Sequence, residues 1–259
     1  MSHRIGACWL MGAALALGVP AGIRAQGRGG PAGPPATVRA AAAIDLTGYW
    51  VSHIVDEWRF RVAPQKGDIP YLPINAAARR VALAWDPARD EAEGNQCKAY
   101  GAVGVMQRPG RLHISWEDDN TLKIETDAGT QTRRFHFGPA PAPTGEPSWQ
   151  GSSVASWQMP GGGRRGGAAP PPGPRSGTLK VVTTNLRPGY IRKNGVPYSG
   201  NAVLTEYLNR LIGQEGDSYL VVTAMVEDPL YLTRPFVRSY QFKKLPDPQG
   251  WDPTPCFPR

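Results

Sequence analysis

Apolar and polar residues alternate with a period of two in many short runs of this 259-residue chain. Residues 111–117 (RLHISWE) place Leu112, Ile114 and Trp116 on one face, and residues 121–127 (TLKIETD) repeat the pattern after an Asp-Asp-Asn turn. This period is that of a β-strand with one buried face, and short turns between such runs favour antiparallel hairpins. The chain is therefore predicted to be mainly β.

About nine strands are expected in all. They cover residues 48–54, 111–117, 121–127, 131–137, 151–158, 178–186, 202–212, 218–227 and 236–244. Residues 58–62 alternate in the same way and extend the first strand, whereas residues 202–212 also fit a helix. Sequential strands with short turns predict a single antiparallel, up-and-down barrel, because closure leaves no exposed edge. A barrel of about eight strands can hold one small ligand.

One segment favours a helix instead. Residues 73–85 (PINAAARRVALAW) are rich in alanine, lack an internal breaker and carry Asn75 as a helix cap. Asp86-Pro87 ends this segment, and residues 88–93 fit one further helical turn. One or two short helices are therefore expected beside the barrel.

The first 25 residues have the order of a secretory signal peptide. His3 and Arg4 form a basic start, residues 5–19 are apolar, and Ala25 offers a small residue for cleavage, with Ala21 as an alternative. The apolar run is shorter than the roughly 20 residues that span a bilayer. We expect an exported mature chain, periplasmic or extracellular, without an integral membrane segment.

Cleavage would leave two of the three cysteines, Cys97 and Cys256. An even number in an oxidising compartment favours a disulfide. The bridge would close a loop of about 160 residues and contribute up to about 5 kcal/mol in the chain-entropy description. A metal pair is the alternative, but two cysteines without a matching Cys or His pattern make a poor zinc site. Neither a metal nor a cofactor is expected.

Two low-complexity stretches, residues 26–44 and 160–177, are rich in Gly, Ala and Pro. They cannot bury enough apolar surface to offset the entropy of ordering, so both are expected to be disordered. With the leader they carry seven arginines and no acid, which leaves 22 basic and 21 acidic residues elsewhere. The net charge of +8 therefore does not indicate a nucleic-acid-binding face. Residues 45–259 are expected to form one barrel domain, with 160–177 as a hairpin insertion.

Four segments resemble uncharacterised secreted bacterial β-barrel proteins. Two of them match the motif W-x-G-x-S-x-x-x-W followed by L-x-V-x-T, and two further stretches are similar to the same group. The four segments are residues 149–157, 179–183, 195–199 and 227–235. The resemblance covers roughly residues 96–244 and implies no established activity. The chain departs from the motif after Trp157, where residues 160–177 replace a tight turn.

A second resemblance is to the lipocalins. Residues 47–50 (TGYW) on the first expected strand are similar to the G-x-W opening of that family. The resemblance implies a barrel that binds a small apolar ligand, an analogy at the level of architecture. The helix of this chain follows the first strands rather than the last, which departs from the lipocalin pattern.

Candidates for acid–base chemistry are few, since the sequence has no P-loop, dinucleotide glycine pattern, H-E-x-x-H or G-x-S-x-G. Glu57 stands beside a tryptophan, and burial there would raise its pKa toward general acid or base work. His113 and Tyr198 complete the candidate set. The alternative is that these groups form salt-bridged strand ends or the polar face of a half-buried sheet.

Residues 187–201 form a loop that is long for a hairpin, and long ordered loops are often functional. The loop carries Tyr190, Arg192 and Tyr198, and it would cover the barrel mouth with Arg192 holding an anion and Tyr198 donating a hydrogen bond. A structural loop packed by its own tyrosines is the alternative. The other candidates for ligand contact are Trp50, Trp58, Arg59, Trp116, Arg133 and Trp157.

Three functions remain open. The first is an exported barrel that binds a small apolar or aromatic molecule, a hypothesis that a barrel filled with side chains would weaken. The second is a lyase, isomerase or hydrolase that uses Glu57, His113 or Tyr198 inside the cavity. The third is a cell-envelope interaction module that uses the arginines of residues 164–175. The oligomeric state does not follow from the sequence.

Overall fold

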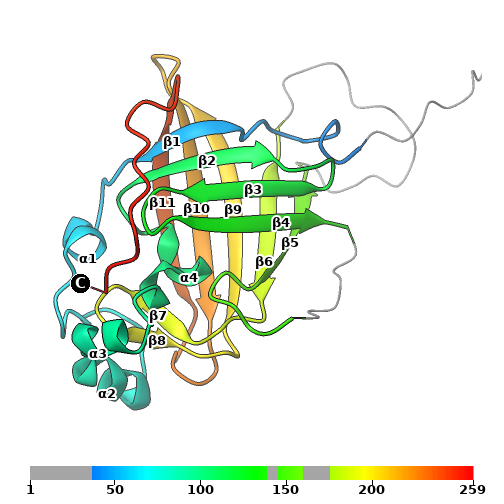
Figure 1. Cartoon of the computed structure of the whole chain (residues 1–259). Helices are drawn as coiled ribbons and strands as arrows, with labels where there is room; N and C mark the ends of the chain where they lie inside the picture. The colour runs from blue at the N-terminus through cyan, green and yellow to red at the C-terminus, as the bar shows by residue number, and fades with distance from the viewer. Residues whose placement is uncertain (1–36, 139–144, 160–175, 259) are drawn as a thin grey trace, which may run out of the picture. The chain divides into compact units, whose positions relative to one another are not determined.

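The computed structural model describes residues 37–138, 145–159 and 176–258, all within the unit Ala36–Arg259 (Figure 1). The strands are β1 (Gly48–Ser52), β2 (Arg111–Trp116), β3 (Thr121–Thr126), β4 (Gln131–Phe137), β5 (Ser152–Gln158), β6 (Thr178–Thr184), β7 (Gly189–Arg192), β8 (Val196–Tyr198), β9 (Val203–Ile212), β10 (Ser218–Glu227) and β11 (Phe236–Leu245). The helices are α1 (Trp58–Val62), α2 (Ala76–Ala84), α3 (Pro87–Ala92), the 3-10 turn η1 (Lys98–Tyr100) and α4 (Ala102–Val105).

Nine strands close into a barrel in the order β1-β11-β10-β9-β6-β5-β4-β3-β2, so the prediction of a mainly β, closed barrel is confirmed. The prediction of a single antiparallel, up-and-down barrel is wrong at one pair of strands, which makes the barrel mixed. Strands β4 and β5 pair in parallel, with Phe135 opposite Ser153, and a parallel pair cannot be joined by the tight hairpin turn that the sequence pattern favours. The hairpin β7–β8 interrupts the sequence between β6 and β9, which are neighbours in the barrel.

Burial alternates along the strands as the period of two requires. On β10 the buried residues are Leu220, Val222, Ala224 and Val226. The strand over residues 202–212, which also fitted a helix, is confirmed as β9 because it pairs with both β6 and β10. One hydrophobic core fills the inside of the barrel and includes the wholly buried Trp50, Phe135 and Phe242.

Residues 58–62 are a helix, α1, so their interpretation as strand is wrong. Glu57 before them has a left-handed backbone with φ of 47°, which ends the extended run after β1. Arg61 turns inward and is 2% exposed, whereas Trp58 is 69% exposed. Alternation over five residues does not separate a strand from one turn of helix that has a single buried residue.

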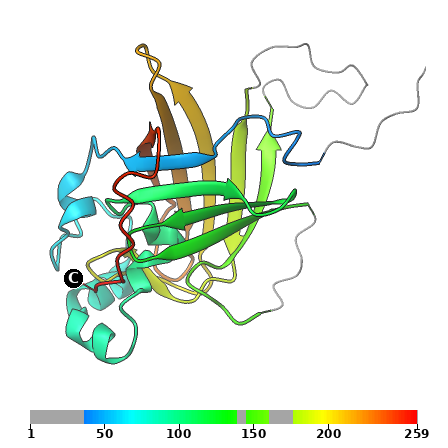
Figure 2. The ribbon, with the colours of Figure 1, turned by 45° about the horizontal axis from the view of Figure 1, so that its top comes forward.

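The predicted helix over 73–85 is confirmed as α2, and Asn75 caps it by accepting a hydrogen bond from Ala78 N at 3.0 Å. The turn over 88–93 is α3. With α1 before them and η1 and α4 after them, the described residues have more helices than the one or two expected. Figure 1 and Figure 2 both show α2, α3 and the β7–β8 hairpin gathered at one end of the barrel, called here the hairpin end. Across the described ranges no helix is both long and apolar enough to span a membrane.

The C-terminal tail returns to this region after β11. Thr254 N donates to the carbonyl of Asp127 at 2.9 Å, and Cys256 forms the predicted disulfide with Cys97. The bridge therefore joins the tail to the segment just before η1. The candidate insertion over 160–177 and the tail over 26–44 lie largely outside the described residues.

Candidate functional site

The loop expected over residues 187–201 is the ordered hairpin β7–β8, which is bound on several sides. The side-chain amide of Gln107 donates to the carbonyl of Ile191 at 2.6 Å. The amide of Asn194 donates to the carbonyls of Gln65 and Asp68 at 3.0 and 3.1 Å. These contacts fix the hairpin to the segments that follow α1 and α4, so its side chains have defined positions at the hairpin end.

A pocket of about 390 Å³ lies beside this hairpin. Rings and apolar side chains form most of its wall: Val81, Pro188, Tyr190, Pro197, Tyr198, Leu230 and Tyr231. The polar side chains of the wall are Lys98, Ser199 and Asn201. Ligand pockets in proteins start at about 300 Å³ and combine a mainly apolar wall with a few placed polar groups. The pocket therefore has the size and composition of a small-molecule site.

Tyr198 is the most constrained residue of this wall. Its ring is 1% exposed, and its buried hydroxyl has no hydrogen-bond partner among the described atoms. A side chain at Gly189 would come within 2.6 Å of that hydroxyl, and one at Gly101 within 2.8 Å. The absence of a side chain at Gly101 and Gly189 therefore provides the space for the Tyr198 hydroxyl. Burial also raises the pKa of Tyr198, so it remains a protonated donor at neutral pH.

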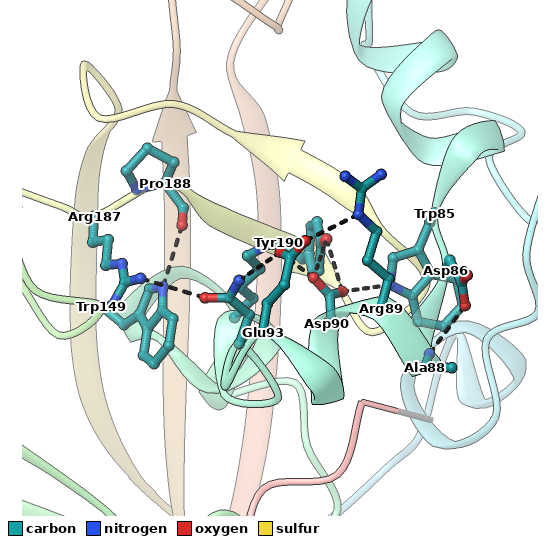
Figure 3. A network of polar contacts seen from close by, with 12 residues as sticks. Trp85, Asp86, Ala88, Arg89, Asp90, Glu93, Trp149, Arg187, Pro188 and Tyr190 are labelled. Atoms are coloured by element: carbon teal, nitrogen blue, oxygen red, sulfur yellow. Dashed lines mark hydrogen bonds and ion pairs between the residues drawn. The ribbon is translucent and has the colours of Figure 1, made fainter.

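Asp90 is a shared acceptor for side chains of this region, and Figure 3 shows it among the polar contacts of α3 and β7. Its carboxylate accepts hydrogen bonds from Trp85 Nε1 at 3.0 Å, from Lys98 Nζ at 2.8 Å and from the Tyr190 hydroxyl at 2.8 Å. Burial, then the hydrogen bond to Asp90, raises the pKa of Tyr190. Asp90 is 5% exposed, so water has little access to compete for these hydrogen bonds. Asp90 therefore sets the position of two side chains that line the pocket.

Further polar contacts extend this network across the hairpin end. Arg187 donates to the side chain of Asn95 at 3.3 Å, and Asn95 donates to Glu93 at 3.1 Å (Figure 3). Trp149 Nε1 donates to the carbonyl of Pro188 at 3.2 Å. The segment before β5 is thereby tied to the start of β7.

The three candidate acid–base residues do not form one site. Glu57 accepts hydrogen bonds from Arg238 at 2.9 Å and Arg192 at 3.4 Å, which is the salt-bridged alternative. His113 lies on the outer face of β2, where it contacts Glu125 at 3.0 Å and stacks on Tyr49. Tyr198 alone lines the pocket. Ser199 is also engaged, since its hydroxyl donates to Asp228 at 2.8 Å.

The candidate ligand contacts divide among four places. Tyr190 lies on the pocket, whereas Trp50 belongs to the barrel core and donates to the carbonyl of Leu46 at 2.9 Å. Trp58 and Arg59 are exposed on α1. The remaining candidates lie inside the barrel or near its opposite end: Trp116 and Trp157 flank the ring of Phe137, and Arg133 pairs with Glu206. The structure therefore does not gather these residues around one ligand.

Arg192 has partners that the sequence did not indicate. Arg61, Arg108 and Arg238 come from three other segments. Burial raises the pKa of the Tyr240 hydroxyl, and the charges of all four arginines oppose that rise. Arginines spread over residues 61–238 carry no common spacing, so the sequence alone offered no signal for this cluster. In the described ranges no group of three or more His, Cys, Asp or Glu side chains is arranged to hold a metal ion.

Comparison with family models, with curated proteins and with solved structures gave no match to this chain. Its function is therefore inferred from the chemistry of the residues at the hairpin end.

Proposed function

We propose that this chain binds a small, partly aromatic molecule in the pocket beside the β7–β8 hairpin. The observation that carries the proposal is a volume of about 390 Å³ whose wall combines three tyrosines with the buried, unpartnered hydroxyl of Tyr198. Tyrosine rings offer faces to a planar ligand, and the Tyr198 hydroxyl, unlike that of Tyr190, is not engaged by another described residue. Lys98 adds N–H donors at the wall, with its charge paired to Asp90 at 2.8 Å, which favours a ligand with a hydrogen-bond acceptor.

The place of binding differs from the one expected from the sequence. Trp50, Phe135 and Phe242 are among the largest wholly buried side chains of the barrel, so the space between the strands is occupied by the protein. The lipocalin-like analogy, with a ligand inside the barrel, loses support for that reason. The pocket outside the strands supports the same ligand class at another site.

Binding is favoured over acid–base catalysis. The carboxylate of Glu57 is engaged by two arginines, and Ser199 donates to Asp228, so neither is poised as a base or nucleophile. The rigid attachment of the hairpin supports binding, since a preformed site avoids the cost of ordering when the ligand arrives. The basic residues 164–175 of the envelope-module hypothesis lie outside the described residues.

Export of the mature chain forms part of the proposal. The basic, apolar and small-residue order of the first 25 residues supports it. The disulfide between Cys97 and Cys256 is consistent with it, because such bridges persist in oxidising compartments. The ligand would then be a molecule met in the periplasm or outside the cell.

A filling substitution tests the site. Val81 lines the pocket from the exposed side of α2, so Val81→Trp should occupy part of the volume without disturbing the core. Leu83→Trp is the matched control, because Leu83 is an exposed apolar residue of the same helix that does not line the pocket. The probe is anilinonaphthalene sulfonate, an aromatic anion whose fluorescence rises on binding, titrated into each protein.

We expect saturable binding to the native protein and to Leu83→Trp, and at least a tenfold weaker affinity for Val81→Trp. Native mass spectrometry of the protein purified without denaturation should also show a bound small molecule that Val81→Trp loses. Equal probe affinity in all three proteins, with equal thermal stability, would refute the pocket as the binding site.

A further inference from the structure

Four arginines from distant segments meet at the hairpin end, on the side of α1 and β11. Arg61 comes from α1, Arg108 from the segment after α4, Arg192 from β7 and Arg238 from β11. Arg61, Arg108 and Arg192 are 2, 5 and 2% exposed. Their charges are close enough to affect one another, because Arg61 and Arg192 both help to lower the pKa of Arg108, after burial itself. The group is called here the arginine cluster.

The buried arginines have donors that nothing in the described protein accepts. Arg61 Nη2, Arg108 Nε, Arg108 Nη2 and Arg192 Nη1 are all buried without a hydrogen-bond partner. Two of these nitrogens, Nε and Nη2, belong to Arg108 alone. A buried donor left without an acceptor costs about 1–3 kcal/mol, and more for a charged group. Four such nitrogens in one cluster call for an acceptor from outside the chain.

The charges of the cluster are not balanced. Asp56 contacts Arg61 at 3.4 Å, and Glu57 contacts Arg192 at 3.4 Å and Arg238 at 2.9 Å. Four cations thus face two carboxylates. The charge of Arg192 also helps to lower the pKa of Asp68, after the hydrogen bond from Arg59. The Asp68 carboxylate is, however, already paired with Arg59 at 2.7 Å. The cluster retains an excess of about two positive charges, and buried charges are normally paired.

Three of the guanidinium groups lie over the faces of aromatic rings. The guanidinium carbon of Arg61 lies 5.2 Å from the centre of the Tyr240 ring, and that of Arg192 lies 4.5 Å from the centre of Phe60. Arg238 lies 4.8 Å from the centre of Phe236. A ring face attracts a cation without using the N–H groups at its edge. The rings therefore leave donors free for an oxygen acceptor.

We infer that the arginine cluster is a binding site for a compact oxyanion with a charge near −2, such as phosphate, sulfate or a short dicarboxylate. Planar guanidinium groups pair with such oxygens through two parallel N–H bonds. The excess charge of the cluster and its unpartnered nitrogens match one such ion. This site is separate from the hairpin pocket, although Arg192 and Tyr190 belong to the same strand.

Glu57 has a specific role in this arrangement. The side chain of Glu57 is 28% exposed and that of Arg238 is 29% exposed, so these two residues mark the edge of the cluster that faces solvent. Its carboxylate already occupies donors of Arg192 and Arg238. An arriving anion competes with this carboxylate, and removal of the Glu57 charge should therefore strengthen binding.

The test uses inorganic phosphate and sulfate in isothermal titration and thermal unfolding of the whole chain, at fixed ionic strength with chloride as the balancing ion. We expect saturable binding of either dianion and a rise in Tm that acetate does not reproduce. Arg108→Met should weaken binding at least tenfold and raise the Tm of the anion-free protein, since it removes an unpaired buried charge. Glu57→Gln should tighten binding about tenfold.

Two further variants keep the test decisive. Arg192→Lys retains the charge but loses the planar pair of donors, so it should weaken binding even if Arg108→Met does not fold. Arg134→Met is the matched control, because Arg134 is an exposed arginine that pairs with Glu117 on the outer face of the barrel. The inference is overturned if chloride and phosphate act alike, or if Arg192→Lys and Glu57→Gln leave the phosphate affinity unchanged. It is supported only by opposite changes in these two variants. Because the hairpin pocket is tested with Val81→Trp, failure of one site does not imply failure of the other.

Discussion

Arg133 and Glu206 form a two-point ion pair inside the barrel, with Nη1 to Oε1 at 2.9 Å and Nη2 to Oε2 at 2.6 Å. The two residues stand on β4 and β9, with β5 and β6 between them, and both side chains are at most 1% exposed. The hydroxyl of Thr183 accepts a further contact from Arg133 at 3.5 Å. This pair has the balance of charge that the arginine cluster lacks.

Removal of one partner of this pair should be strongly destabilising. Arg133→Met leaves the Glu206 carboxylate buried without its cation, and a broken buried pair costs about 3–5 kcal/mol. Replacement of both residues, Arg133→Met with Glu206→Leu, should recover most of the loss, because no charge is then buried. Urea unfolding of the three proteins measures the difference.

The matched control for this prediction is the exposed pair of Arg134 and Glu117, with a shortest distance of 2.7 Å. An exposed pair contributes about 0–1 kcal/mol. Arg134→Met should therefore change the free energy of unfolding by less than about 1 kcal/mol. Similar losses for Arg133→Met and Arg134→Met would contradict the assignment of Arg133 to the barrel interior.

The disulfide should stabilise the chain mainly by restricting the unfolded state. Cys97 and Cys256 are separated by 159 positions, and a loop of that size corresponds to about 5 kcal/mol as an upper value. Cys97→Ser with Cys256→Ser should lower Tm, and a reducing agent should lower the Tm of the native protein to a similar value. If the reducing agent also lowered the Tm of the double variant, the loss of stability in the native protein could not be attributed to the disulfide.

The pH dependence of stability should include a contribution from Asp45. Burial alone would raise the pKa of this carboxylate, but hydrogen bonds from the hydroxyl and backbone N–H of Thr47, at 2.7 and 2.9 Å, hold the pKa below its ordinary value of 3.8. A carboxylate with a lower pKa in the folded state stabilises the protein above its unfolded pKa and loses this contribution as pH falls. Asp45→Asn should therefore show a smaller fall in Tm below about pH 4 than the native chain. An unchanged acid profile would argue against the Thr47 contacts in solution.

Much of the fold follows from local pattern. The period of two gives the barrel strands and their buried faces, and the alanine-rich run with its Asn75 cap gives α2. The parallel pairing of β4 and β5 does not follow, because it depends on where the connecting chain crosses and not on the residues of either strand. The helix α1 was missed for a related reason, since the inward-facing Arg61 donates to the carbonyl of Gln107, which is 46 residues away in the sequence.

The candidate sites were harder to predict than the fold. The long loop is the hairpin that lines the pocket and carries Arg192, and its role in binding stays a prediction. Arg108 and Arg238 have no motif, and only the closed barrel brings them together with Arg192. The tryptophans were expected to share one ligand cavity, but Trp50 lies in the core and Trp58 is exposed. The sequence does not distinguish a buried tryptophan from an exposed one.

Asp90 links stability to the proposed pocket. Its carboxylate accepts from three donors, on Trp85, Lys98 and Tyr190, and it is the nearest anion to the Lys98 ammonium at 2.8 Å. Asp90→Asn exchanges one acceptor oxygen for a donor, so at least one of the three groups loses its partner. Loss of a hydrogen bond to a charged group of this kind costs about 1.5–3 kcal/mol.

We expect Asp90→Asn to lower the free energy of unfolding by that amount and to weaken the binding of anilinonaphthalene sulfonate, because Lys98 and Tyr190 are then free to leave the wall of the pocket. Glu93→Gln is the matched control. Glu93 follows α3 directly, is 47% exposed, and pairs with Arg89 on the surface. Urea unfolding and probe titration of both variants distinguish the outcomes. A loss of stability in Asp90→Asn with unchanged probe affinity would place Asp90 in the fold and not in the support of the binding site.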